Sequence, residues 1–514
     1  MKDINVLQEM IDNKHYIEAL NWVDEHIDDI SDQVLDKDVF SKLIDDQYSK
    51  APELLIKLME KKLISLENVK PVRSQFFKRN DELAKVLFKQ PGFKIKDDPD
   101  DPLLHYYITK DKTELAVELI KSNKVNINEK LDYDTALHLA IKKKNDTVLD
   151  ALVSSMAINP SIKDINLMLT KKKDKFVLKL IKNKKINPNE QRSGRSLLAL
   201  SILKDKKEIT EALVAEYGVE AFMTKYKREK LESALNSLDV KADALDTHEA
   251  LLVSTLLASS EKGGKPITVM STNDFIIYCH VIRENSIPMT ELFLVHDIHW
   301  VSGEIRILSD NQINVFFNDS LPSMLDQPGS PMNIMGKIFS DVPDVHFYYP
   351  DVKLQRAPEG CKIFALDGCY RLDHIKEFLP KSAQGDLFKY LADNKVHQES
   401  DSGIIFSSSK LPLYLMKTMQ SRELIKNYET RSLEERSLPL NKKIQNSEEV
   451  IKNRFLSDGQ NKTIDKKRGK LVARLQEKKR SVDQLSEILL ENSISGFIKR
   501  HYKTNVSNKN KLGG

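Results

Sequence analysis

The chain contains three cysteines, Cys279, Cys361 and Cys369, and a cysteine attacks a carbonyl carbon only as its thiolate. The pKa of a thiol falls at the N-terminus of a helix and beside a histidine. Cys361 begins a segment whose apolar residues recur at helical spacing, so it lies where a helix N-terminus is expected. Cys369 lies on the apolar stripe of that helix and Cys279 lies in a strand-like run, so both are expected in the core. The sequence therefore predicts Cys361 as the cysteine that is placed to act as a nucleophile.

The residues that could activate this thiol lie upstream of it. His299 follows a strand-like segment, and Asp319 stands at the end of the next one. A histidine can accept the thiol proton, and a carboxylate can hold the imidazole in the tautomer that this requires. Gln355 precedes the cysteine by six residues, and its side-chain amide could donate a hydrogen bond to an oxyanion. This order, with His and Asp ending strands and Cys opening a helix, predicts nucleophilic chemistry at Cys361.

The elements that must position these side chains are expected after about residue 225. Four segments there are rich in β-branched and aromatic residues and show the alternation of strands: ITVMSTNDFIIYCHVI, TELFLVHDIHWVSG, EIRILSDNQINVFFND and DVHFYYP. Within the third, SDNQ supplies a hairpin turn. The segment CKIFALDGCYRLDHIKEFL then follows with helical spacing. The second half is therefore predicted to be a mixed α+β domain.

The first half is predicted to be helical and repetitive. TALHLAI (135–141) resembles the opening of an ankyrin repeat, in which Thr caps the first helix and His hydrogen-bonds within the turn. PLLHYYI (102–108) repeats the pattern, and His105 and His138 are separated by the thirty-three residues of the ankyrin period. SLLALSI (196–202) is a weaker copy. These residues predict a degenerate ankyrin solenoid in which both histidines are structural.

Composition and charge narrow the classes of function. The chain is 30% charged and 40% hydrophobic, no apolar stretch is long enough to span a bilayer, and MKDINVLQEM lacks the apolar region of a secretory signal peptide. Three cysteines cannot build a disulfide framework, and no Cys/His cluster has metal spacing, so no metal site is expected. The net charge of +4 conceals a basic stretch: residues 441–480 hold thirteen Lys/Arg and five Asp/Glu, a net charge of +8. That stretch is either a solvated helix face or a polyanion site.

The second half resembles the YopJ-type effectors, Ser/Thr/Lys acetyltransferases with the ubiquitin-like-protease fold of peptidase clan CE. The most specific local match is LQRAPEGCKIF, where the family carries Gln-Arg, four residues, Cys, and then Ile-Phe one residue further. HWVSGEIRILSDNQINVFFNDSL matches the family's pattern of His, strand and acid, and NKKIQNSEEVIKNRF parallels its C-terminal stretch. The resemblance covers roughly residues 240–470.

Two positions in this pattern have a competing candidate. Gap-free spacing from His299 places Asn318 at the acid position, whereas Asp319 requires a shift of one residue. We favour Asp319 because a carboxylate holds the imidazole in the needed tautomer and because DSL is typical of clan CE at this point. His296 is the alternative base, but the dipeptide HW fits the family pattern better at His299.

The resemblance implies an acetyltransferase mechanism. Cys361 would accept an acetyl group from acetyl-CoA as a thioester, His299 would act as general base, and Asp319 would orient its imidazole. Gln355 and the backbone N–H of Cys361 would stabilise the tetrahedral intermediate. The resemblance also implies inositol hexakisphosphate as an activator. The residues that best match its binding site are Lys442, Lys443 and Arg454, with Lys462 and Lys466 to Arg468 as weaker matches.

These observations predict a multidomain chain, in which an all-α ankyrin solenoid precedes a clan CE-type α+β domain with a helical basic tail. The expected parts are a helical region over 1–100 that could hold further degenerate repeats, ankyrin repeats over 101–225, the catalytic domain over 226–440 and a basic regulatory region over 441–514. Ankyrin stacks bind proteins, so the expected partner is a host protein substrate. The family suggests a MAP-kinase-cascade kinase. No nucleic acid and no membrane span are expected, and the oligomeric state stays open.

The whole arrangement predicts a secreted bacterial effector that acts in the host cytoplasm. Two other functions remain open at this point. A cysteine protease of ubiquitin-like modifiers uses the same His, Asp and Cys with water as the acceptor, although the basic tail argues against it. A non-enzymatic ankyrin scaffold would carry an eroded site, and Gly360 and Lys362 do depart from the residues usual beside the family's cysteine. The presence of Cys361, His299 and Gln355 argues against the scaffold.

Overall fold

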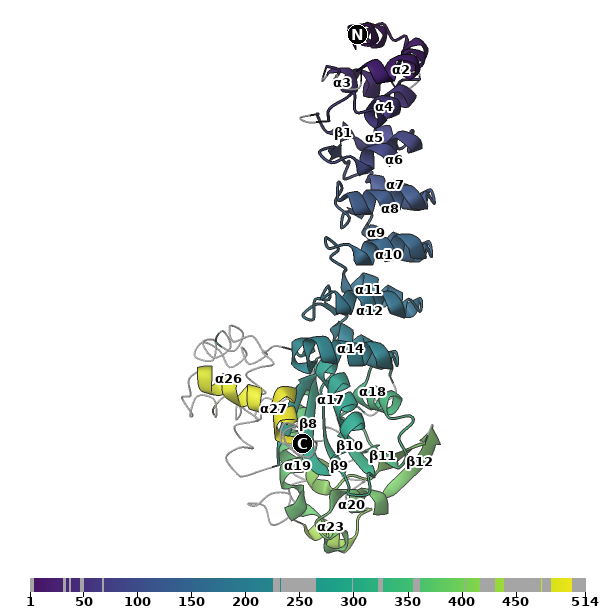
Figure 1. Cartoon of the computed structure of the whole chain (residues 1–514). Coiled ribbons are helices and arrows are strands. Elements are labelled where there is room, and N and C mark those ends of the chain that lie inside the picture. Colours follow the sequence, from purple (N-terminus) through teal and green to yellow (C-terminus); the bar gives the residue numbers. More distant parts are fainter. Residues whose placement is uncertain are drawn as a thin grey trace, which may run out of the picture. The chain divides into compact units, whose positions relative to one another are not determined.

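The computed structural model describes residues 4–30, 34–36, 38–46, 50–66, 69–224, 232, 265–297, 299–321, 327–354, 361–401, 403–416, 430–438, 473 and 482–501 (Figure 1). The chain divides into two compact units, Met1–Glu190 and Gln191–Gly514. The predicted limits at 100/101, 225/226 and 440/441 are finer than this division and stay predictions.

The first unit is built from short helices that lie in successive pairs (Figure 1). Its helices are α1 (Ile4–Asp12), α2 (Tyr16–Ile30), α3 (Asp38–Asp45), α4 (Ala51–Glu60), α5 (Ser74–Phe77), α6 (Asp81–Lys89), α7 (Leu103–Thr109), α8 (Thr113–Ser122), α9 (Ala136–Lys142), α10 (Asp146–Ser154), α11 (Ile162–Thr170) and α12 (Asp174–Lys182). Two-residue strands occur at β1 (Val72–Arg73), β2 (Ile95–Lys96), β3 (Lys130–Leu131) and β4 (Asp134–Thr135). Each pair contacts the next, as α8 does α10 and α10 does α12.

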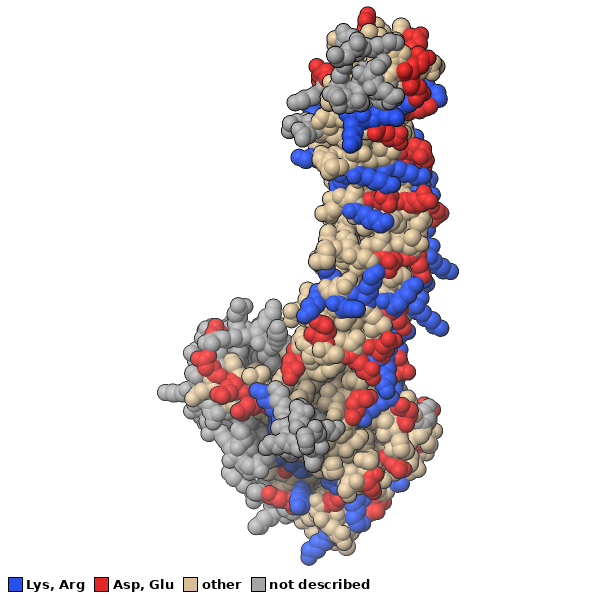
Figure 2. All heavy atoms as spheres, in the orientation of Figure 1, with Lys and Arg blue, Asp and Glu red and all other residues tan. Residues whose placement is uncertain are grey.

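Polar contacts between successive pairs recur at a spacing of about thirty residues. Lys112 Nζ donates to Asp81 at 2.6 Å, thirty-one residues back, and Lys173 Nζ donates to Asp146 at 2.6 Å, twenty-seven residues back. Figure 2 shows the resulting mixture of basic and acidic side chains along these helices. Each contact joins the start of the second helix of one pair to the start of the second helix of the preceding pair. The first unit is therefore periodic along the chain.

Both histidines of the repeat pattern are buried and hydrogen-bonded. His105 Nε2 lies 3.1 Å from the backbone oxygen of Asp134, and His138 Nδ1 lies 3.0 Å from Asp164 Oδ1. The hydroxyl of Thr135 caps α9 by accepting the backbone N–H of His138 at 3.0 Å. The predicted structural role of the two histidines and the predicted threonine cap are therefore confirmed.

The second unit begins with a further helix pair and then forms a seven-stranded mixed sheet. The pair is α13 (Leu197–Leu203) and α14 (Lys207–Tyr217), preceded by β5 (Gln191–Arg192) and β6 (Arg195–Ser196) and followed by the 3-10 helix η1 (Val219–Phe222). The strand order is β12-β13-β11-β10-β9-β8-β7. The strands are β7 (Ile267–Ser271), β8 (Met289–His296), β9 (Val301–Ile307), β10 (Ile313–Asn318), β11 (Val345–Pro350), β12 (Lys395–Asp401) and β13 (Ile404–Ser409). Pairing is antiparallel for β8/β9, β9/β10 and β12/β13, and parallel elsewhere.

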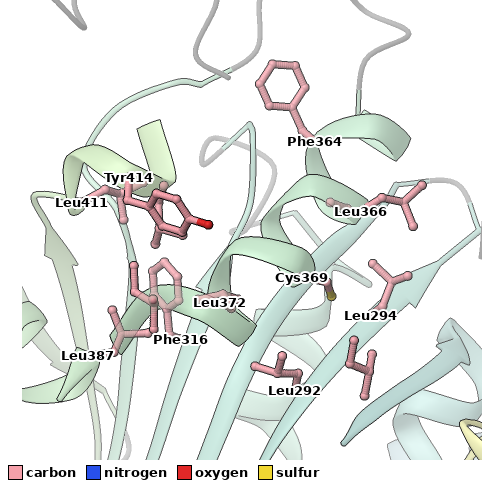
Figure 3. Packing of buried hydrophobic residues seen from close by; sticks show 14 of the residues in the cluster. Leu292, Leu294, Phe316, Phe364, Leu366, Cys369, Leu372, Leu387, Leu411 and Tyr414 are labelled. Atoms are coloured by element: carbon pink, nitrogen blue, oxygen red, sulfur yellow. The ribbon is translucent and has the colours of Figure 1, made fainter. Parts of the chain in front are cut away.

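Helices cover both faces of the central strands, so β10 is buried along its whole length. On one face, Phe317 packs edge-on against Phe293 and Phe347 at centroid distances of 5.7 and 5.4 Å, and Phe275 of α17 (Thr272–Asn285) reaches Phe293. On the other face, Phe316 joins a cluster with α19 (Cys361–His374), part of which is shown in Figure 3. The central strands of the sheet therefore form the middle layer, with α17 packed on one face and α19 on the other.

The remaining elements surround this core. They are α18 (Pro331–Ile338), η4 (Ile375–Phe378), η5 (Lys381–Ala383), α20 (Leu387–Asp393), α21 (Leu413–Met416), α23 (Leu433–Ser437), α26 (Val482–Glu491) and α27 (Ile494–His501). Helix α27 packs beside β7 and is held by the buried carboxylate of Glu291, which bonds both Arg500 and His501. No helix among the described residues is long and apolar enough to span a membrane.

The sequence prediction of the α+β half is confirmed in outline and wrong at one element. The predicted strands of the second, third and fourth segments are present, as are the hairpin between β9 and β10 and the helix that opens at Cys361. However, the run from Ile267 to Ile282 is not one strand: it ends as β7 at Ser271, and the rest is α17. Ser271 caps that helix by accepting the N–H of Asp274 at 3.1 Å. Cys279 is thus a buried residue of a helix. The segment was predicted as a strand because a helix that is buried on most sides has no apolar periodicity to mark it.

Candidate active site

The candidate nucleophile, Cys361, is the first residue of α19 and is only partly buried. The helix packs against β8 and β9, and its apolar residues are part of the cluster in Figure 3. The free N–H groups of the first helical turn place partial positive charge beside the thiol, which favours the thiolate. Cys361 therefore stands where a helix of the core meets the ends of strands.

The predicted acid and base are in direct contact. Asp319 follows the last residue of β10 and is fully buried, and its Oδ1 lies 2.7 Å from Nε2 of His299. The same oxygen accepts the backbone N–H of Leu321 at 2.7 Å, which fixes the carboxylate. Because Nε2 faces Asp319, Nδ1 is the ring nitrogen left for the thiol. The imidazole of His299 also lies close enough to the thiol of Cys361 for each group to shift the pKa of the other, so the three side chains lie next to one another.

The pKa values of these three residues favour the charged forms of His299 and Cys361. Burial lowers the pKa of His299, but its hydrogen bonds to Asp319 and Cys361 outweigh burial and raise that pKa to about 9. Burial would raise the pKa of Cys361, but His299 and the backbone N–H groups of Trp300 and Lys362 reverse this and hold the pKa below its ordinary value. The pKa of Asp319 is raised by burial, which its contact with His299 opposes. A thiolate facing an imidazolium is therefore favoured over the neutral pair.

The other two cysteines are in a different environment. Cys369 is completely buried between α19 and the sheet, near Leu294 in Figure 3, and its Sγ lies 3.6 Å from the backbone oxygen of Phe293. Burial raises the pKa of both Cys369 and Cys279 well above the ordinary thiol value. Their predicted places in the core are confirmed, and neither carries a reactive thiolate at neutral pH.

The competing candidates for the acid and the base lie elsewhere. Asn318 points from β10 toward α19, where its Nδ2 lies 3.2 Å from the hydroxyl of Ser302. His296, the last residue of β8, packs its ring against Trp300 at a centroid distance of 5.6 Å. The geometry therefore brings His299 and Asp319, not His296 and Asn318, to Cys361.

A glycine of α19 that the sequence analysis did not single out sets how closely the helix approaches the sheet. A Cβ at Gly368 would lie 2.1 Å from Asn318 Nδ2 and 2.5 Å from Ser302 Oγ. Any side chain at this position would force either α19 or the buried side chains of Asn318 and Ser302 to move. Since Cys361 is carried by the helix and its partners by the strands, Gly368 helps to set the distance between them.

The turn that leads to His299 is strained at Asp297. This feature was not predicted from the sequence. Asp297 directly follows β8 and has φ of 140°, a value that favours glycine. Its carboxylate accepts the backbone N–H of Thr272 at 2.7 Å and lies 3.4 Å from His296 Nδ1. The turn is thereby tied to the start of α17. An Asp between two histidines carries no sequence signal for this role, because the strain is visible only in the backbone.

Two groups of predicted residues fall outside the described part of the chain. They are Gln355, and the basic residues Lys442, Lys443, Arg454, Lys462 and Lys466 to Arg468. Their assignments stay predictions. Among the described residues, no group of His, Cys, Asp or Glu could hold a metal ion. The arrangement allows Cys361 to attack an activated carbonyl and His299 to accept and return a proton.

The family described as "YopJ Serine/Threonine acetyltransferase" matches residues 256–503. No curated protein matches the chain. A solved structure of an AvrA deletion variant with IP6 and CoA is 16% identical, with 50% of this chain and 100% of that chain covered and a TM-score of 0.34. A crystal structure of HopZ1a in complex with IP6 is 13% identical, with 56% and 100% covered and a TM-score of 0.32. The family match places a YopJ-family acetyltransferase domain at residues 256–503 of this chain.

Proposed function

We propose that this domain transfers an acetyl group from acetyl-CoA, through a thioester on Cys361, to Ser, Thr or Lys side chains of a protein. The observation that carries the proposal is the hydrogen bond between Asp319 and His299 beside the thiol of Cys361, in a region that matches an acetyltransferase family. This arrangement supplies a thiolate, a proton carrier and a group that stabilises the imidazolium, which are the requirements of two-step acyl transfer.

In the first step, the thiolate of Cys361 attacks the acetyl carbonyl carbon of acetyl-CoA. The carbon–sulfur bond to CoA breaks, and the departing CoA thiolate takes the proton of the His299 imidazolium. In the second step, the neutral imidazole accepts the proton of the acceptor hydroxyl or amine while that atom attacks the acetyl-cysteine. The bond to Cys361 breaks and the thiolate is restored opposite the imidazolium. Asp319 holds the ring in place through both steps, and Gln355 is our candidate for stabilising the oxyanions.

We further propose inositol hexakisphosphate as the activator. Supporting this are the resemblance of NKKIQNSEEVIKNRF to the family's C-terminal stretch and the net charge of +8 over residues 441–480. A ligand with six phosphates requires several cations that converge on it, and Lys442, Lys443, Arg454 and Lys462 are the candidates. The role of these residues rests on the sequence.

The helix pairs before this domain are, in our proposal, degenerate ankyrin repeats that bind the protein to be acetylated. The period of about thirty residues, the Thr135 cap and the two buried histidines support this assignment. A host kinase of a MAP-kinase cascade is the substrate class we propose, with the protein acting as a secreted bacterial effector in the host cytoplasm. Both points rest on the family resemblance.

The test is acetyl transfer by the full-length chain. The protein is incubated with radiolabelled acetyl-CoA and a candidate kinase, with and without inositol hexakisphosphate, beside a Cys361→Ala control. We expect label on the enzyme and the kinase, dependent on the activator and absent from the control. Absence of transfer combined with cleavage of a ubiquitin-type substrate would instead assign the site to a protease, with water as the acceptor.

A further inference from the structure

The strand β12 ends one side of the sheet and is exposed along its whole length. It pairs with β13 on its inner side, and no described strand pairs with its outer side. All seven of its residues, from Lys395 to Asp401, are exposed, including Val396 at 55%. Figure 1 shows β12 projecting at the end of the sheet away from α19. An open strand edge presents backbone N–H and C=O groups that can pair with another strand.

The basic and acidic residues of β12 are divided between its two ends. The first half carries Lys395 and His397, and the second half carries Glu399 and Asp401. His397 and Glu399 share one face, with Nε2 and Oε2 3.9 Å apart. In an antiparallel pair of two such strands, each basic end lies beside an acidic end, whereas a parallel pair places like charges together. The sequence of the strand is thus complementary to itself in the antiparallel direction.

We propose that β12 is a homodimer interface, in which two copies of this chain pair their β12 strands antiparallel about a two-fold axis. With the axis at Gln398, the His397 of one copy lies opposite the Glu399 of the other on the same face, where the imidazole can donate a hydrogen bond. The two Gln398 side chains then face each other and can exchange amide hydrogen bonds. This is an isologous interface, in which each contact occurs twice.

A bulge limits the regular part of this pairing. The register of β12 against β13 shifts between Lys395 and His397, so regular alternation begins at His397. Lys395 lies on the other face, where its Nζ donates to Gln398 Oε1 at 2.8 Å, so the basic and acidic residues that face each other across the axis are His397 and Glu399. The interface is therefore small, and we expect association in the micromolar range rather than an obligate dimer.

The interface is distant from the acetyl-transfer site. Helix α19 packs on β8 and β9, and the strands β10, β11 and β13 lie between β9 and β12. Four strand spacings correspond to about 20 Å. Changes confined to β12 should therefore leave the turnover of the monomer unchanged.

Charge swapping tests the proposal with the full-length chain. One variant carries Lys395→Glu and His397→Glu, which makes β12 acidic throughout; the other carries Glu399→Lys and Asp401→Lys, which makes it basic throughout. Sedimentation velocity over a range of concentrations should show a monomer–dimer equilibrium for the native chain and monomers for each variant alone. An equimolar mixture of the two variants should dimerise again, because positions 397 and 399 then place an acidic residue of one variant opposite a basic residue of the other. Thermal melting of each variant, close to that of the native chain, controls for folding.

Three results would overturn the proposal. A native chain that stays monomeric at every concentration has no such interface, and its β12 edge is then open to an extended segment of another protein. Variants that dimerise as well as the native chain place the interface elsewhere. Variants that stay monomeric when mixed show that their charges do not face each other.

Discussion

At the scale of single residues, the proposed chemistry depends on the contact between His299 and Asp319. Their atoms are 2.7 Å apart and the carboxylate is fully buried, so its negative charge acts on the imidazole at short range and without screening by water. That contact does two things: it leaves Nδ1 facing the thiol, and it stabilises the imidazolium that faces the thiolate. A residue that only accepted a hydrogen bond would provide the first effect without the second.

Replacing the acid should therefore lower turnover much more than replacing its neighbour. We expect Asp319→Asn to reduce kcat by at least about 100-fold, because the amide cannot stabilise the imidazolium. Asn318→Ala should cost stability, since Asn318 is buried against Ser302, but should leave kcat within a few-fold. Acetyl-transfer kinetics and thermal melting of both variants check this. The opposite ranking of the two kcat values would move the acid role to position 318.

The pH dependence of thiol reactivity follows from the pKa values of the pair. The thiolate–imidazolium pair exists above the lowered pKa of Cys361 and below the pKa of His299, which is about 9. Alkylation of Cys361 by iodoacetamide should thus be rapid already at neutral pH, where an ordinary thiol is mostly protonated. In Asp319→Asn, the imidazolium is less stable and the pKa of Cys361 should rise, so the rate at neutral pH should fall several-fold. Peptide mapping at a series of pH values measures this, and identical profiles for the two proteins would contradict it.

At the scale of elements, the site is assembled by the seating of α19 on the sheet. Local patterns were enough to predict the strands, the hairpin and the helix that opens at Cys361, because these depend on alternation and spacing within short segments. Two contributions could not be read in this way. The close approach at Gly368 and the positive φ of Asp297 exist only once segments far apart in the chain have packed together. The burial of α17 on most sides likewise removed the periodicity that marks a helix, so part of it was predicted as strand.

The seating of α19 can be tested at Gly368. Gly368→Ala introduces a Cβ at 2.1 Å from Asn318 Nδ2, so either the helix or the buried side chains of Asn318 and Ser302 must shift. We expect a loss of about 1–3 kcal/mol in the free energy of unfolding, with a fall in kcat as Cys361 moves away from His299. The matched control is Gly336→Ala in α18, where the nearest atom to the new Cβ, in Phe406, lies at an ordinary 3.6 Å. This control should be neutral or slightly stabilising, because alanine favours a helix over glycine. Denaturant unfolding and acetyl-transfer kinetics of both variants measure these effects. Equal changes in stability and kcat for the two variants would show that the close approach at Gly368 is unimportant.

At the scale of the whole molecule, the proposed activator should connect the basic stretch to the catalytic domain. If Lys443 and Arg454 bind inositol hexakisphosphate, the ligand should raise the melting temperature of the full-length chain by mass action. The shift should shrink as salt is added, because the contacts are ionic. Lys443→Glu and Arg454→Glu should abolish both the shift and the activation of acetyl transfer, while the proposed binding of substrate to the helical repeats should be retained. Thermal shift assays at low and high salt provide the measurement. A shift that survives both substitutions would place the activator elsewhere.

The most direct test of the whole account is to find the acetyl group on the enzyme. The native chain, Cys361→Ala and Cys369→Ala are each incubated with acetyl-CoA and inositol hexakisphosphate, quenched in acid and mapped by mass spectrometry. We predict an acetyl thioester on Cys361, removable by hydroxylamine, in the native chain and in Cys369→Ala. The latter should be less stable by roughly 1–2 kcal/mol, because it empties a buried site. Cys361→Ala should carry no thioester and transfer no acetyl group. Acetyl transfer by Cys361→Ala, or a thioester found on Cys369, would contradict the account.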